Sequence, residues 1–297
     1  MPVHPPWLRF QAYVVGLPKT GSTSMATLFG NYRSGHEWQL NELLELALAR
    51  RRGTMSDREF AEAAGRRLVP ASLEMNSATC HHLYLDFLID RFPHAVFFHT
   101  IRDVLSWTTS LLDMVLWKRL TGRMVPVSFP MPAREILREM TGGTGSLDPD
   151  DEGDDRSSLL PLMRFWTAHM RETASLLPAD RSLQIRTREI PNRLPEIAAL
   201  AGIPVATLRQ DWSHSNRSAH RFDRFRAFDS EELRGAYDRQ CASHMADLFP
   251  SEHAAWMDYR TENSPREASG DDWNRYRSEL LKRMADAARK FGPRITH

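Results

Sequence analysis

The chain has 297 residues, of which 41% are hydrophobic and 26% charged, so it can bury a sizeable core and is not disordered in bulk. Its net charge of +1 argues against a general attraction to nucleic acids or membrane surfaces. No apolar run approaches the roughly 18 residues of a membrane span, the N-terminus lacks the basic-then-apolar order of a signal peptide, and the two cysteines indicate no disulfide scaffold. We expect a cytoplasmic protein without a nucleic-acid or membrane partner; the sequence does not predict its oligomeric state.

The first half of the chain alternates between predicted strands and helices. Residues 10–16 form an apolar run that predicts a buried strand, and a glycine-containing loop and a helix from Ser24 follow it. The clearest strand is predicted over residues 95–101, where apolar residues dominate. The remaining predictions in this half are helices over residues 39–51, 56–67, 82–92 and 103–117 and a strand over residues 67–74.

The second half begins with a Gly-rich and then acidic stretch over residues 142–156, which predicts a mobile surface loop. A strand is predicted over residues 182–186, and helices over residues 157–177, 192–201, 229–247 and 271–290. Strands that alternate with helices predict an α/β fold of three layers, a central parallel sheet flanked by helices as in P-loop nucleotide kinases. Without a repeat or a clear linker, we expect a single domain over residues 1–297, with residues 205–297 mainly helical.

The loop after the first predicted strand, GLPKTGSTS over residues 16–24, has the Gly-x4-Gly spacing of a phosphate-binding loop. In a nucleoside-triphosphate loop a lysine follows the second glycine, but Ser22 stands there and Lys19 lies two residues before Gly21. The strand over residues 95–101 ends in Ile101-Arg102-Asp103, which gives no convincing magnesium-binding carboxylate. An anion cradle rich in hydroxyls therefore remains the favoured interpretation. A P-loop kinase or NTPase, or a helix N-terminus without a ligand, is the weaker one.

The same loop resembles the 5′-phosphosulfate loop of sulfotransferases that use PAPS (3′-phosphoadenosine 5′-phosphosulfate). The residues that carry this resemblance are Pro18, Lys19, Thr20, Gly21, Ser22, Thr23 and Ser24. A second element is similar: in that family a strand ends in an arginine, a serine follows eight residues later on a helix, and both bind the 3′-phosphate of the donor. Arg102 and Ser110 have that separation. Many relatives have proline after the Arg-Asp pair, whereas this chain has Val104.

The resemblance covers roughly residues 10–37, 68–112 and 157–204, the last as a weaker match in which Arg186 or Thr187 would approach the adenine. It implies transfer of a sulfuryl group from PAPS to a hydroxyl or amine of a small-molecule acceptor, with PAP (adenosine 3′,5′-bisphosphate) as product and no metal. Lys19 would stabilise the leaving phosphate. A protein that binds the nucleotide without catalysis is a further alternative.

The resemblance also implies a general base, Glu or His, soon after the helix that follows the loop. Glu37 is the favoured candidate and His36 the next. Glu37 could instead be a charge at the start of the following helix. Glu74 is a further candidate for the base, with His81 in reserve. The adjacent Cys80, His81 and His82 lack further ligands at suitable spacing, so we expect no metal site there.

Overall fold

The computed structural model describes residues 8–120, 155–209 and 224–265, together with residues 135, 278 and 282. Contacts between Cα atoms divide the chain into two compact units. Unit 1 consists of Met1–Arg102 and His169–Asn216, and unit 2 of Asp103–Ala168 and Arg217–His297. The single domain expected from the sequence stays a prediction. No helix in the described ranges is long and apolar enough to cross a membrane.

Unit 1 is built on a five-stranded sheet with the order β2-β3-β1-β4-β5, and all neighbouring strands are parallel. The strands are β1 (Ala12–Val15), β2 (Ser34–His36), β3 (Met75–Ser77), β4 (Val96–Ile101) and β5 (Ser182–Arg186). The chain thus starts at the central strand, adds two strands on one side, and then crosses to the other side of β1. The carboxyl end of β1 is therefore the point at which the strand order reverses, where open α/β sheets bind their ligands.

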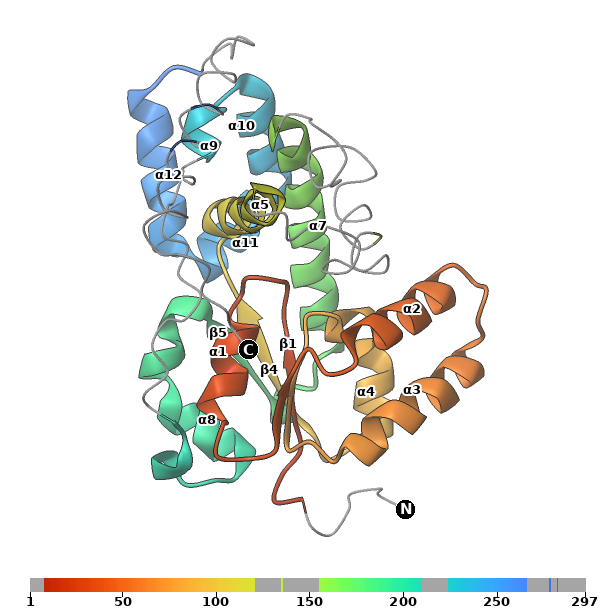
Figure 1. Cartoon of the computed structure of the whole chain (residues 1–297). Helices are drawn as coiled ribbons and strands as arrows, with labels where there is room; N and C mark the ends of the chain where they lie inside the picture. The colour runs from red at the N-terminus through yellow and green to blue at the C-terminus, as the bar shows by residue number, and fades with distance from the viewer. Residues whose placement is uncertain are drawn as a thin grey trace. The chain divides into compact units, whose positions relative to one another are not determined.

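Helices cover both faces of this sheet (Figure 1). One face carries α1 (Ser22–Leu28) and α8 (Leu194–Ala201), and the helices on the other side are α2 (Leu40–Arg51), α3 (Asp57–Ala71) and α4 (Leu85–Arg91). Val14 and Phe98 belong to the buried cluster that includes residues of α1 and α8. Tyr13 points to the opposite face, where its ring stacks on Phe97 with centroids 6.0 Å apart. A strand that is buried on both faces has a largely apolar sequence, as β1 and β4 do. The predicted α/β fold of three layers with a parallel sheet is confirmed.

One predicted strand in unit 1 is wrong, and one strand of its sheet was not predicted. Residues 67–71 are not a strand but the end of α3. A capping box between Ser56 and Glu59 begins this helix, and Ser72, whose φ is 49°, caps its C-terminal end. The strand in this region is β3, which begins only at Met75. Strand β2 was not predicted, because its three residues at the edge of the sheet, Ser-Gly-His, include no large apolar side chain.

Unit 2 is helical in its described part. Its helices are α5 (Val104–Leu120), the portion of α7 (Asp155–Leu176) before His169, α9 (Arg224–Ala227), α10 (Glu231–Gln240), α11 (Ala242–Leu248) and α12 (Pro250–Glu262). The single helix predicted over residues 229–247 is wrong: it is α10 and α11, which are separated at Cys241. Helix α12 was not predicted. Residues 142–154 of the predicted loop, and all but two residues of the helix predicted over residues 271–290, lie outside the described residues.

Candidate active site at the carboxyl ends of the parallel strands

The candidate residues of unit 1 follow the carboxyl ends of its five strands. The loop over residues 16–24 follows β1, Glu37 follows β2, Thr79 lies just beyond β3, Arg102 follows β4 and Thr187 follows β5. Because the carboxyl ends of parallel strands share one edge of a sheet, these segments converge there. This convergence is the first indication of a functional site.

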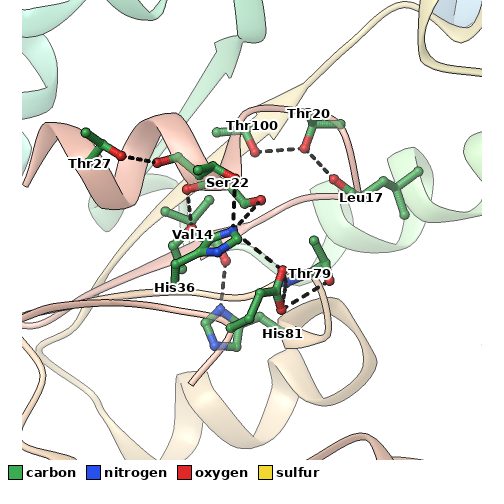
Figure 2. A network of polar contacts seen from close by, with 12 residues as sticks. Val14, Leu17, Thr20, Ser22, Thr27, His36, Thr79, His81 and Thr100 are labelled. Atoms are coloured by element: carbon green, nitrogen blue, oxygen red, sulfur yellow. Dashed lines mark hydrogen bonds and ion pairs between the residues drawn. The ribbon is translucent and has the colours of Figure 1, made fainter. Parts of the chain in front are cut away.

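The loop itself is held tightly against β4. A Cβ atom on Gly16 would lie 2.4 Å from Thr100 Oγ1 and 2.6 Å from Thr20 Oγ1, so only glycine fits at this position. Thr20 Oγ1 donates to the Leu17 carbonyl at 2.7 Å and lies 3.0 Å from Thr100 Oγ1, which is left to donate to it (Figure 2). Gly21 has φ 109°, a conformation that side chains rarely adopt, and it begins α1. The fold therefore requires glycine at position 16 because of the close packing, and favours it at position 21 because of the backbone conformation.

Lys19 occupies the left-handed region of backbone space, with φ 69°. Its carbonyl oxygen accepts a hydrogen bond from Arg102 Nη1 at 3.2 Å. A non-glycine residue at such a φ costs on the order of 1–3 kcal/mol and persists only where its surroundings hold it. This hydrogen bond connects the Arg102 side chain with the backbone of Lys19, the two residues whose cations are predicted to bind anions. Ser110 is a buried residue of α5 in unit 2, and its pairing with Arg102 stays a prediction.

The hydroxyls of the first turn of α1 contact His36 (Figure 2). His36 Nε2 lies 3.3 Å from Ser22 Oγ and 3.2 Å from Thr23 Oγ1. The same nitrogen is 3.7 Å from Glu37 Oε1. The two candidate bases are therefore neighbours of the predicted phosphate loop. Pro18 and Ser24, the other residues of that loop named from the sequence, are half-buried.

The end of β3 fixes the Glu37 carboxylate. The Thr79 backbone N–H lies 3.3 Å from each carboxylate oxygen, and the Thr79 hydroxyl donates to Oε2 at 3.4 Å. The backbone of Glu37 is also left-handed, with φ 56°. Lys19 and Glu37 are two of the four described non-glycine residues with a positive φ. Strained residues gather where geometry serves function, so this pair marks the same edge of the sheet.

The His36 side chain is 35% exposed, and its partial burial lowers its pKa below the ordinary value of 6.5. At pH 7 the ring is therefore mainly neutral, and a neutral imidazole nitrogen can accept a proton. The site thus offers two possible proton acceptors, the imidazole of His36 and the carboxylate of Glu37.

Glu74 does not fit the role of base. Its buried carboxylate accepts hydrogen bonds from Arg9 Nε and Nη2, both at 2.8 Å, and from the Arg33 backbone N–H at 3.0 Å. Burial alone raises the pKa of this carboxyl, but the hydrogen bonds outweigh it and lower the pKa to about 2. Glu74 precedes β3, so it lies at the amino edge of the sheet, opposite the loop. Glu74 therefore has a structural role, as the partner of Arg9 in an ion pair.

His81, His99 and His169 are buried histidines of unit 1, and His82 beside them is half-buried. Burial lowers the pKa of His81 and His82 to about 4 and that of His99 to about 3, and it also lowers the pKa of His169. His81 Nδ1 lies 2.7 Å from the Val14 carbonyl, so the ring is fixed against β1. The His169 ring centroid is 5.0 Å from that of His82 and 5.5 Å from that of His99. In the described part of the chain no His, Cys, Asp or Glu residues form a group that could hold a metal ion.

The hydroxyls that hold the site together were not predicted from the sequence. Thr79 and Thr100 were not singled out, and Thr187 was expected near the adenine rather than on the loop. The Thr187 hydroxyl lies 2.6 Å from the Thr20 carbonyl oxygen and 3.0 Å from the Ile101 carbonyl oxygen. A threonine at or just after the end of a predicted strand is a signal that marks the positions of Thr100 and Thr187, although not their contacts, whereas Thr79 does not directly follow any predicted strand.

Comparison with known proteins identifies the family. The family model described as "Sulfotransferase domain" matches residues 12–193, more than half of the chain. No curated protein matches the chain.

Several solved structures are similar, at identities and TM-scores that carry no argument of their own. A sulfotransferase from Alicyclobacillus acidocaldarius is 13% identical with a TM-score of 0.46, over 84% of this chain and 98% of that chain. The sulfotransferase domain of the Synechococcus PCC 7002 olefin synthase is 13% identical with a TM-score of 0.39, over 95% and 97% of the two chains. The family model, which spans all five strands and the loop of residues 16–24, decides the assignment: the chain belongs to the sulfotransferase domain family.

Proposed function

We propose that this chain is a PAPS-dependent sulfotransferase that transfers a sulfuryl group to a hydroxyl or amine of a small-molecule acceptor. The observation that carries the proposal is the hydrogen bond between Arg102 and the backbone of Lys19, beside a second pair, Glu37 and His36. An anion-binding segment with two cations therefore adjoins two groups that can accept a proton. Sulfuryl transfer to an alcohol needs both.

The residues present fit a donor with anionic groups at both its 5′ and 3′ positions. The loop from Gly16 to Ser24 contains a lysine and four hydroxyl side chains and no carboxylate. Arg102, directly after β4, supplies a second cation, and a guanidinium is well suited to a phosphate because of its planar set of donors. We infer that the loop binds the 5′-phosphosulfate and that Arg102, with Ser110, binds the 3′-phosphate.

PAPS supplies an activated sulfuryl group, whose bond to the bridging phosphate oxygen breaks as the acceptor oxygen bonds to sulfur. The Lys19 ammonium stabilises the negative charge that builds on that bridging oxygen, a differential effect that lowers the barrier. Glu37 accepts the proton that the acceptor hydroxyl loses. Thr79 keeps the Glu37 carboxylate oriented, and neutral His36 separates Glu37 from the hydroxyls of Ser22 and Thr23. The proposal includes no metal.

A comparison of nucleotides tests the donor class. PAP is expected to raise the unfolding temperature more than ADP at equal concentration, because only PAP carries a 3′-phosphate for Arg102. A ligand at about 100 times its Kd stabilises the folded state by about 2.7 kcal/mol, which a thermal-shift assay resolves easily. Equal shifts would remove Arg102 and Ser110 from the proposal, and stabilisation by ATP with Mg²⁺ alone would favour a kinase or NTPase. PAP binding without turnover of PAPS across an acceptor panel would indicate a non-catalytic nucleotide-binding protein.

Replacing Glu37 with glutamine tests the general base. We expect Glu37→Gln to lower kcat by about 10²–10⁴-fold, the contribution of a positioned acid or base, with PAP affinity preserved. A base works in its deprotonated form, so the wild-type rate should fall as the pH is lowered through the pKa of the base, and Glu37→Gln should lose this dependence. The measurement is PAP release from PAPS across a pH series.

Two further variants make this assignment specific. Glu45→Gln removes an exposed carboxylate from α2 and should leave both rate and pH profile unchanged. His36→Gln should retain the acid limb of the profile if Glu37 is the base. Loss of that limb in His36→Gln but not in Glu37→Gln would transfer the role to His36.

A further inference from the structure

The Thr187 hydroxyl connects two segments that the proposed function assigns to different phosphates. It has one hydrogen and two acceptors close by, the Thr20 carbonyl at 2.6 Å and the Ile101 carbonyl at 3.0 Å. Thr20 directly precedes Gly21 in the loop, and Ile101 directly precedes Arg102 at the end of β4. One side chain of the segment after β5 therefore bridges the loop and the arginine.

These bonds also fix the direction of a backbone N–H. In a trans peptide the C=O and the following N–H point in opposite directions. Because the Thr20 carbonyl is directed at Thr187, the N–H of Gly21 is directed away from it. The same holds for the Ile101 carbonyl and the N–H of Arg102. Thr187 thus orients a backbone donor in each of the two segments.

The methyl group of Thr187 has a separate role. A Cβ atom on Gly21 would lie 3.3 Å from Thr187 Cγ2 and 3.0 Å from Ile190 Cδ1, so the second glycine of the loop lies against these two side chains. The hydroxyl and the methyl of one threonine therefore act on adjacent residues of the loop, Thr20 and Gly21. Substitutions that remove one group at a time can separate these contributions.

We propose that Thr187 is a positioning residue that sets the separation between the Lys19 loop and Arg102, and thereby selects donors that carry both a 5′- and a 3′-phosphate. The inference rests on the proposed function, because it takes the loop and Arg102 as the two anion sites. Thr187 does not need to touch the nucleotide for this. It keeps the two sites in register, as the direct bond from Arg102 to the Lys19 carbonyl also does.

The test compares the affinities of PAP and 5′-AMP by titration calorimetry in the wild type, Thr187→Val and Thr187→Ser. Valine keeps the methyl and removes the hydroxyl, whereas serine does the reverse. 5′-AMP carries only the 5′-phosphate, so a change in register should weaken PAP more than 5′-AMP. We expect Thr187→Val to reduce the ratio of PAP to 5′-AMP affinity about tenfold, the effect of one lost hydrogen bond of about 1.4 kcal/mol, and Thr187→Ser to keep the wild-type ratio.

An unchanged ratio of PAP to 5′-AMP affinity in Thr187→Val would overturn the proposal. If both affinities fell equally, the role of Thr187 would be purely structural, and if neither fell, Thr187 would have no role in binding. If Thr187→Val does not yield folded protein, Thr187→Ala gives the same comparison, and a wild-type ratio in that variant would also overturn it. Failure of the wild type to bind PAP would instead reject the proposed function, and this inference with it. The two failures are therefore distinguishable.

Discussion

Replacing Lys19 with alanine is expected to lower kcat by at least about 10²-fold, which is the scale of losing one group that stabilises a transition state electrostatically. The lysine lies in the loop that follows the central strand, and a hydrogen bond from Arg102 to its carbonyl oxygen holds its backbone. If its ammonium acts on charge that appears only as the donor bond breaks, the loss should fall mainly on kcat. The measurement is PAP release from PAPS, with PAP affinity determined in parallel.

Two variants control for the loss of a positive charge in general. Lys282→Ala removes an exposed lysine in the C-terminal part of the chain and should retain wild-type turnover. Lys19→Arg keeps the charge but replaces a compact ammonium with a planar fork, so we expect it to recover only part of the rate. Near-normal turnover in Lys19→Ala would refute the assignment of Lys19.

Unit 1 is expected to lose stability steeply between pH 6.5 and pH 5, because four of its histidines, three of them buried and His82 half-buried, resist protonation. Their folded-state pKa values are lowered, to about 4 for His81 and His82 and about 3 for His99, whereas an unfolded histidine titrates near 6.5. The unfolded chain therefore binds more protons as the pH falls below 6.5. The stability that these neutral rings contribute is complete above that pH and is lost progressively below it.

The size of the effect follows from the number of groups. At pH 5.5 each unfolded histidine carries about 0.9 proton, so four of them give a slope of roughly 5 kcal/mol per pH unit in the free energy of unfolding. Typical domains have only about 5–15 kcal/mol in total, so we expect acid unfolding near pH 5. Glu74 cannot produce this transition, because its carboxyl with a pKa of about 2 loses its contribution only as the pH falls below about 4.5.

Urea unfolding between pH 5 and pH 7 measures this slope. His99→Gln should reduce it by about 1.2 kcal/mol per pH unit, the share of one group. His94→Gln, at an exposed position, should leave it unchanged. A wild-type slope below about 1 kcal/mol per pH unit would contradict the buried, neutral state of these rings.

The sequence predicted the parts of the fold in which local pattern and tertiary position agree. Strand β4 lies inside the sheet, between β1 and β5, with both faces covered, so it appears as an apolar run. The loop after β1 appears as a spacing of glycines. The end of α3 failed as a prediction because a run of apolar residues next to a proline is compatible with either a strand or a final helical turn. Strand β2 failed because an edge strand of three polar or small residues acquires its conformation from its neighbour β3, not from its own composition.

The candidate site divides in the same way. Lys19 and Arg102 were identifiable from motifs because each follows a strong strand within a short segment. The roles of Thr187 and Thr79 were not identifiable, since each depends on a contact between residues far apart in the sequence: Thr187 with Thr20, and Thr79 with Glu37. Glu74 was misjudged because the sequence does not reveal which arginines a carboxylate pairs with.

The left-handed backbone of Lys19 and Glu37 implies a trade-off between folding and activity. Lys19 has φ 69° and Glu37 has φ 56°. Glycine would adopt this backbone conformation at a lower energy at either position, because it has no Cβ to clash with the backbone. A search for thermostable variants should therefore favour replacement at these two positions, whereas selection for turnover should retain them. Stability gained at positions 19 and 37 would be gained at the expense of chemistry, so thermostability alone is a misleading criterion when this protein is improved.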